Sequence, residues 1–279
     1  MIVGLLSWYD ENPAWLYELV QTCGQHGITH LAALDGAYAG LPGGSAQSPA
    51  AQHDALLAAA RAFNVGLTLS AHRPVWQHEM AKRAALFDLG REVFTTYGIT
   101  PSIHNHGDWF VVIDADEAII KSPSSLQSEL ARIGSEGLFA VDIPVITPTF
   151  ATKRHANPDK RFDWYRKCFR ALPDLTCRGR HYTYTSESVG LLWGQPAERL
   201  LPAAELEELV MLHRHRPEDS RRVQQRTYYK ERDLAGVEYD ACDQCSAPAV
   251  RSFPDGTITC RKHAHLYAVQ TGQRDTGRR

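Results

Sequence analysis

The sequence contains no long apolar run. One of its longest apolar stretches is only Trp109–Ile113, whereas a helix that spans a bilayer needs about 18 or more apolar residues. The opening residues, MIVGLLSWYDEN, carry no basic segment ahead of the apolar one and so lack the pattern of a secretory signal peptide. We therefore expect a soluble, cytoplasmic protein without a membrane partner.

Motifs that mark several common enzyme classes are absent as well. The glycine fingerprint of dinucleotide-binding folds, the P-loop and Gly-x-Ser-x-Gly do not occur. His78-Glu79 begins like a zinc-protease motif, but Lys82 stands where the second histidine would be needed. These absences argue against a Rossmann dehydrogenase, a P-loop nucleotidase, a zinc protease and an α/β-hydrolase.

The net charge is small, because 30 Lys and Arg nearly balance 32 Asp and Glu, which leaves −2. The balance conceals an uneven distribution. Residues 1–150 contain 7 basic and 15 acidic residues, whereas residues 151–232 contain 17 and 11. Such asymmetry predicts that the two segments face different partners, although scattered surface charge would explain it equally well.

Cysteine is rare until the C-terminal region. There the spacing is Cys242-x2-Cys245, fourteen residues, then Cys260-x2-His263. Two closely spaced pairs of nitrogen and sulfur ligands suit a tetrahedral structural Zn²⁺ site. His265 is an alternative to His263, and a disulfide is the alternative to zinc. The other three cysteines are expected to be small buried residues: Cys23, Cys168 and Cys177.

The segment between these pairs predicts a hairpin. Ala249–Phe253 and Thr257–Thr259 flank Pro254-Asp255-Gly256, which is a favourable turn sequence. A zinc-ribbon-like segment over residues 233–279 follows, appended to a larger domain over residues 1–232. So small a segment depends on its metal, because it buries too little apolar surface on its own.

Strands and helices alternate along the first part of the chain. Alternation of this kind predicts an α/β fold with a mainly parallel sheet, which binds ligands at the carboxyl ends of its strands. The expected strands are Ile2–Ser7, Thr29–Leu34, Val65–Ser70, the segment from Asp108 to the acidic cluster, and Phe139–Ile146. The expected helices are Pro13–Gln25, Ala50–Phe63, Val75–Tyr97 and a basic, amphipathic Phe162–Leu172.

Acidic residues stand where two of these strands end. Asp35 follows one strand, and Asp114-Ala-Asp116 follows another. Hard divalent cations such as Mn²⁺ and Mg²⁺ are commonly held by one or two carboxylates together with phosphate oxygens. Asp114 and Asp116 would therefore suit a metal–diphosphate complex, although acidic turns are common at strand ends.

In this context residues 1–232 resemble glycosyltransferases of the GT-A fold, family-2 type. The opening strand with its Asp-Glu-Asn turn, the strand-end Leu34-Asp35-Gly36 and above all Trp109-Phe-Val-Val-Ile-Asp-Ala-Asp-Glu carry the resemblance. It implies a nucleotide-sugar donor such as a UDP-sugar, with Mn²⁺ or Mg²⁺ and inversion at the sugar. The donor-binding residues it implies are Tyr9, Asp35, Arg73, Arg83 and Asp114. The catalytic residues it implies are Asp114, Asp116 and His181.

The same resemblance assigns a late histidine to the metal. We expect His213 to approach Asp116 as a second ligand, with His215 as the alternative. His181 would line the acceptor pocket. The general base that receives the acceptor proton stays open among four residues: Asp142, Asp163, His181 and Glu187.

The acceptor is suggested by basic residues interleaved with tyrosines. Arg214–Arg232 contains seven basic residues around Tyr228 and Tyr229, a composition that suits a nucleic-acid backbone with stacking bases. One hypothesis is therefore a hydroxylated base in DNA, as in phage DNA modification, with the ribbon assisting. A protein or glycan acceptor is the alternative. A non-catalytic, zinc-ribbon nucleic-acid-binding protein is the alternative of another class.

Overall fold

The structure is a computed structural model of the chain. It describes residues 1–37, 44–70, 75–76, 79–147, 163–177, 183–194, 199–214, 251–252 and 258–259. The predicted domain boundary after residue 232 lies outside these ranges. No helix in the described part of the chain is long and apolar enough to cross a membrane.

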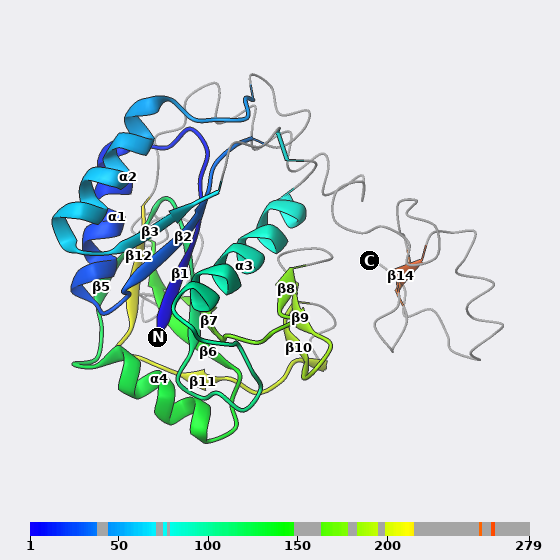
Figure 1. Cartoon of the computed structure of the whole chain (residues 1–279). Coiled ribbons are helices and arrows are strands. Elements are labelled where there is room, and N and C mark those ends of the chain that lie inside the picture. The colour runs from blue at the N-terminus through cyan, green and yellow to red at the C-terminus, as the bar shows by residue number, and fades with distance from the viewer. Residues whose placement is uncertain are drawn as a thin grey trace, which may run out of the picture.

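A nine-stranded sheet forms the centre of the molecule (Figure 1). Its strand order is β3-β2-β1-β4-β7-β6-β12-β5, and β11 pairs with β6. Neighbouring strands are parallel except where β7 and β5 take part, so the sheet is mixed and largely parallel. The strands are β1 Ile2–Ser7, β2 His30–Leu34, β3 Gly66–Leu69, β4 Trp109–Asp114, β5 Glu117–Lys121, β6 Ala140–Ile146, β7 Asp163–Arg170, β11 Ala204–Glu205 and β12 Val210–His213.

Helices cover both faces of the sheet. The helices are α1 Pro13–Gln25, α2 Ala50–Phe63, α3 Glu79–Thr96 and α4 Leu126–Ser135. One apolar core joins α1, α2 and α4 to one face, and a second joins α3 to the other. Strand β1 serves both cores, because Ile2 and Leu6 belong to the first and Val3 and Leu5 to the second. Such alternation is what a strand buried on both faces requires.

A small three-stranded sheet lies beside α3 (Figure 1). It consists of β8 Thr176–Cys177, β9 Tyr184–Ser186 and β10 Gly190–Trp193. Tyr184 and Leu192 join the core on the α3 face. Arg166 of β7 ties this sheet to the central one, because its guanidinium donates to the Leu192 carbonyl at 2.5 Å.

Local sequence explains where the first helix starts. The Asn12 side chain accepts a hydrogen bond from the Ala14 N–H, and Pro13 occupies the first helical position. After the helix, Gly27 has φ of +85°, a conformation that releases the chain toward β2. The predicted bounds of this helix and of Ala50–Phe63 match the structure.

The predicted α/β class with a mainly parallel sheet is confirmed. The predicted hairpin near the C-terminus is also seen, since Arg251–Ser252 (β13) pairs antiparallel with Ile258–Thr259 (β14). One element was predicted wrongly: Phe162–Leu172 is not a helix, because Asp163–Arg170 forms strand β7 between β4 and β6. Its apolar residues repeat almost as in a helix, but its aromatic residues fit a strand between two partners.

Candidate functional site

The parallel strands bring several polar residues to one edge of the sheet. Strands β1, β2 and β4 are in register there, with Ser7 opposite both Leu34 and Asp114. Strand β12 is parallel to β6 and ends on the same edge at His213. This is the edge at which ligands bind to open α/β sheets.

A two-residue turn carries the acidic motif. Strand β4 ends at Asp114, and β5 begins at Glu117. The Asp114 N–H donates to a carboxylate oxygen of Glu117 at 2.8 Å. The Arg214 N–H donates to the Asp116 carbonyl at 2.8 Å. The turn is therefore held from both sides by hydrogen bonds.

Strand pairing brings His213 to this turn. Strand β12 is antiparallel to β5, with His213 opposite Glu117. As expected from the sequence, His213 approaches Asp116, and its Nε2 lies 3.4 Å from Oδ2. Its Nδ1 lies 3.4 Å from the Thr147 hydroxyl at the end of β6. Both side chains of the pair reach solvent, with 41% of His213 and 21% of Asp116 exposed.

The pairing with Asp116 changes the acid–base behaviour of His213. A hydrogen bond with Asp116 and the negative charges of the turn raise the pKa of His213 above its ordinary value, although partial burial opposes this. The imidazolium form is thus stabilised when only the protein surrounds it. A cation bound to the pair would compete with that proton, because a ligating imidazole must be neutral.

Asp114 is held by two cations from different elements. Arg83 on α3 donates to one carboxylate oxygen at 2.8 Å, and Lys167 on β7 donates to the other at 3.0 Å. Lys167 also lies 2.9 Å from Glu117. Burial alone would raise the pKa of Asp114, but the positive charges of Lys167 and Arg83 hold this pKa well below its usual range. Asp114 is therefore ionised at neutral pH.

Lys167 and Glu117 are buried members of the same cluster. Despite burial, the attraction of Asp114 and Glu117 raises the pKa of Lys167 well above its usual range. Burial raises the pKa of Glu117, with a further contribution from Asp114, while Lys167 opposes the rise. The cluster thus combines a lysine whose pKa is raised with two carboxyl groups whose pKa values are shifted in opposite directions, Asp114 downward and Glu117 upward.

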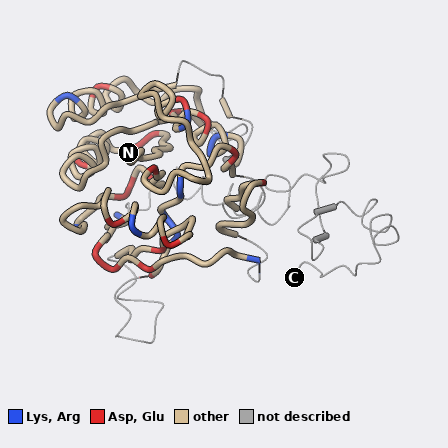
Figure 2. The backbone as a smooth tube through the Cα atoms, turned by 60° about the horizontal axis from the view of Figure 1, so that its bottom comes forward, with Lys and Arg blue, Asp and Glu red and all other residues tan. Residues whose placement is uncertain are grey.

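Lys167 was not found from the sequence, because its segment was interpreted as a helix with an exposed basic face. In the structure, three basic residues of β7 are buried: Arg166, Lys167 and Arg170. Arg166 forms a two-point ion pair with Asp142, with nitrogen–oxygen distances of 2.8 and 3.0 Å. Figure 2 shows acidic and basic positions lying next to one another along the described backbone. Aromatic residues spaced through a basic segment were the available signal for a strand.

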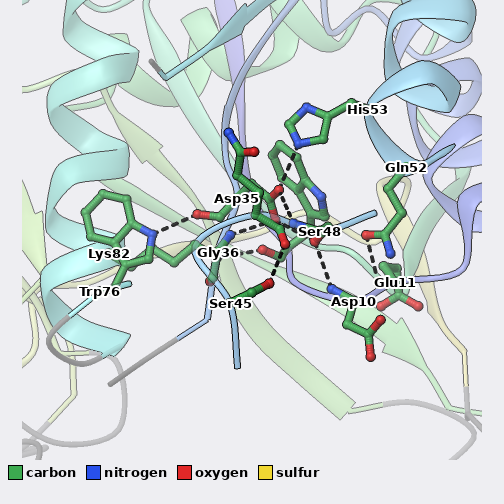
Figure 3. Close-up of polar contacts among 12 residues, drawn as sticks. Asp10, Glu11, Asp35, Gly36, Ser45, Ser48, Gln52, His53, Trp76 and Lys82 are labelled. Carbon is green, nitrogen blue, oxygen red and sulfur yellow. Dashed lines mark hydrogen bonds and ion pairs between the residues drawn. The ribbon is translucent and has the colours of Figure 1, made fainter. Parts of the chain in front are cut away.

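Asp35 lies at the same edge but is engaged by the protein itself (Figure 3). Its Oδ1 accepts hydrogen bonds from the Gly36 N–H and the Ser48 hydroxyl, both at 2.6 Å. Its Oδ2 accepts from the Ser48 N–H at 2.7 Å and lies 2.8 Å from His53 Nε2. Only 9% of the Asp35 side chain is exposed. Four contacts from three residues occupy the four acceptor positions of a carboxylate.

Neighbouring side chains complete this network (Figure 3). Lys82 on α3 donates to the carbonyls of Trp8 at 2.6 Å and Gly36 at 2.8 Å, which joins the ends of β1 and β2. The Trp76 indole donates to the Asp35 carbonyl at 2.7 Å. The predicted donor-binding residue Tyr9 accepts a hydrogen bond from the Ser45 N–H at 2.9 Å. Together these contacts shape the part of the edge next to the acidic turn.

Several predicted site residues lie outside the described ranges, so the structure says nothing about their roles. They are Arg73, His181, His215, Cys242, Cys245, Cys260, His263 and His265. Of the general-base candidates, Asp142 is paired with Arg166. Asp163 is the first residue of β7, and Glu187 lies in the turn between β9 and β10.

Within the described residues, no group of three or more His, Cys, Asp or Glu side chains is arranged to hold a metal ion. Asp116 and His213 offer two ligands, an oxygen and a nitrogen. This donor pair suits Mn²⁺ or Mg²⁺ if phosphate and water oxygens complete the coordination. The residues present therefore fit a metal that is bound together with a phosphorylated ligand.

Comparisons with known proteins add a distant likeness to solved structures. No protein-family model and no curated protein matches the chain. Among solved structures, the chain is similar to glucosyl-3-phosphoglycerate synthase from Mycobacterium tuberculosis, in a complex with Mn²⁺, UDP and glucosyl-3-phosphoglycerate. The identity is 15%, the match covers 93% of this chain and 86% of that one, and the TM-score is 0.40. The function of the present chain therefore has to be inferred from its own side chains.

Proposed function

We propose that the chain is a metal-dependent glycosyltransferase that moves a sugar from a nucleotide-sugar donor to an acceptor hydroxyl. The observation that carries the proposal is the pair Asp116 and His213, 3.4 Å apart beside the ionised Asp114, where the parallel strands end. The resemblance of the Asp114-Ala-Asp116 strand to that of GT-A transferases points to the same activity.

Each group in the cluster has a role in this proposal. Asp116 and His213 would hold Mn²⁺ or Mg²⁺, which would supply positive charge to the departing nucleoside diphosphate. Asp114 is 35% exposed and ionised, so it can accept hydrogen bonds from hydroxyl groups of the donor. Arg83 neutralises part of the acidic turn and adds positive charge where a diphosphate would lie.

Glycosyl transfer also needs a base for the acceptor proton. Asp142 is a poor candidate, because Arg166 occupies both of its oxygens. Asp163 and Glu187 remain, together with His181, and inversion at the sugar is an expectation from the resemblance. The acceptor proton must move to a group within about 3 Å of the acceptor hydroxyl.

The acceptor proposal rests on the sequence. The basic, tyrosine-containing run after Arg214 predicts DNA with a hydroxylated base, and a protein or glycan is the alternative. Arg214 itself lies 2.5 Å from Glu18 of α1, so it is held by the protein. Duplex and single-stranded DNA binding, measured between low and high salt, tests this proposal. Affinity that does not fall with salt would contradict an electrostatic interface.

The activity is tested with a panel of UDP- and GDP-sugars. Binding is followed by thermal shift with and without Mn²⁺, and slow donor hydrolysis by release of the nucleotide. We expect Mn²⁺-dependent protection that Asp116→Asn and His213→Gln abolish. Asp88→Asn and His104→Gln are matched controls, since both positions are exposed and neither belongs to the acidic turn.

Two outcomes would contradict parts of the proposal. If no nucleotide sugar protects the wild-type protein when Mn²⁺ is present, the transferase function fails. DNA binding without any response to nucleotide sugars would instead favour the non-catalytic alternative. The proposed zinc site is tested separately, by the metal content of the purified chain and of a Cys242→Ser variant.

A further inference from the structure

Lys167 occupies an irregular position in the central sheet. In the pairing of β6 with β7, Val141 is opposite Cys168 and Asp142 is opposite Arg166, so Lys167 has no partner in β6. This is a β-bulge, which bends the strand and changes the direction of a side chain. The bulge allows the consecutive residues Arg166 and Lys167 to reach two different carboxylates, Asp142 and Asp114.

The Lys167 ammonium joins the two ends of the acidic turn. It donates to Asp114 at 3.0 Å, the last residue of β4, and to Glu117 at 2.9 Å, the first residue of β5. The Asp114 N–H donates to the same Glu117 carboxylate. These three hydrogen bonds close a ring around Ala115 and Asp116. The Asp116 side chain is not part of this ring.

Burial makes this arrangement costly unless it is complete. Lys167 and Glu117 are both buried, and a buried charge is tolerated only when it is paired and hydrogen-bonded. The strand β5 does not continue beside β4, because it pairs instead with β12 at the far end of the sheet order. No strand ladder between β4 and β5 fixes the turn, so the side-chain contacts of Lys167 and Glu117 hold it together with the backbone bond from Arg214 to the Asp116 carbonyl.

We propose that Lys167 is a positioning residue for the acidic turn: by binding Asp114 and Glu117 together, it holds Asp116 where it faces His213. This rests on the proposed function, since it assigns Lys167 the task of keeping the metal and donor site assembled. Lys167 touches neither Asp116 nor His213 in the contacts above, so it acts through the turn.

The simpler alternative is that Lys167 only neutralises the charge of the buried Glu117. The two ideas differ when both charges are removed together. Glu117→Gln keeps a carbonyl oxygen that can accept from the Asp114 N–H. Lys167→Met combined with Glu117→Gln removes the buried ion pair without leaving a lone charge. If neutralisation is the whole role of Lys167, this double variant regains full binding.

The experiment compares four variants with the wild-type chain. They are Lys167→Met, Glu117→Gln, the double variant, and Lys121→Met as a matched control at an exposed lysine of β5. For each, the melting temperature, amide hydrogen exchange over residues 109–121, and the Mn²⁺-dependent affinity for the donor found in the panel are measured. Lys167→Gln replaces Lys167→Met if the methionine variant does not fold.

We expect Lys121→Met to bind as the wild type does, and Glu117→Gln serves as the reference for the double variant. The double variant should melt close to Glu117→Gln but exchange the Asp114–Glu117 amides faster and bind about 10- to 100-fold more weakly. That range is typical when groups that orient metal ligands are removed. A double variant with the exchange and affinity of Glu117→Gln would overturn the positioning role.

The hydrogen-exchange measurement separates this inference from the proposed function. If the wild type binds no nucleotide sugar, the transferase proposal fails, and the exchange rates still decide the role of Lys167. Faster exchange at an unchanged melting temperature supports positioning. Unchanged exchange refutes it whether or not a donor binds.

Discussion

Replacing Asp35 by Asn tests whether this strand-end carboxylate binds a nucleotide or holds the protein together. The sequence predicted a contact with the donor, yet its two oxygens receive hydrogen bonds from Gly36 and Ser48 and lie beside His53. Gly36 has φ of +106°, and a Cβ there would lie 2.6 Å from the Ala46 carbonyl. Asp35 and Gly36 therefore form a tight connection to the segment that contains Ser48.

The expected cost follows from the contacts that Asn cannot make. Asn keeps one acceptor oxygen and places an NH₂ group against donors, so about half of the four contacts are lost. Hydrogen bonds to a charged group contribute about 1.5 to 3 kcal/mol each, so the loss is about 3 to 6 kcal/mol. For a domain of this size that corresponds to a fall in melting temperature of about 6 to 24 °C.

The assay is thermal unfolding followed by circular dichroism, with Asp88→Asn as the control. Asp88 is 67% exposed and pairs with Arg91 on the surface, so its substitution should cost no more than about 1 kcal/mol. A stable Asp35→Asn variant, within about 2 °C of the wild type, that fails to bind the donor would refute the structural role. It would instead support the predicted role of Asp35 as a nucleotide ligand.

Three further predictions concern the rest of the described chain. Gly90→Ala should destabilise by about 1 to 2 kcal/mol in urea unfolding, because the new Cβ would lie 2.6 Å from Phe110 and outweigh the gain in helix propensity; a stabilised variant would contradict this. Burial raises the pKa of Asp174, but hydrogen bonds from Ser186 and Ser188 outweigh it and lower that pKa. The free energy of unfolding of the wild type should therefore exceed that of Asp174→Asn by about 1 kcal/mol above pH 3.8, and this difference should vanish as the pH falls through the lowered pKa. A difference that persists or grows in acid would contradict the prediction. Burial raises the pKa of Cys168 to about 12, so a thiol reagent should modify it only as fast as the chain unfolds; rapid labelling in native buffer would be inconsistent with its burial.

The sequence predicted most elements up to Asp114, because they are regular and locally encoded, but it missed strand β5 and helix α4, which follow the acidic turn. The helices Pro13–Gln25 and Ala50–Phe63 have clear apolar faces and recognisable ends. The strand that ends at Asp114 is a continuous apolar run between polar residues, which is typical of a strand buried on both faces. The approach of His213 to Asp116 was expected from the family resemblance, which assigns a late histidine to the metal, and the structure places the two side chains 3.4 Å apart.

Strand β7 shows why the second half was harder. The apolar residues of β7 repeat at spacings that also suit a helix: Trp164, Tyr165, Cys168 and Phe169. In such a helix, the basic residues would form an exposed face. Only its neighbours make a buried strand possible, because Asp114, Glu117 and Asp142 supply the negative charges that Lys167 and Arg166 need. That complementarity comes from residues distant in the chain.

By itself, the sequence determined the alternation of helices and strands and the presence of an acidic turn after a buried strand, since both depend on local periodicity and residue type. Tertiary structure alone decided which charges are available at that turn. Asp114 and Glu117 are held by Arg83 and Lys167, whereas Asp116 points to His213. Long-range pairing of β5 with β12 and of β7 with β4 and β6 makes this difference, because the energy of a charge depends on what surrounds it in space.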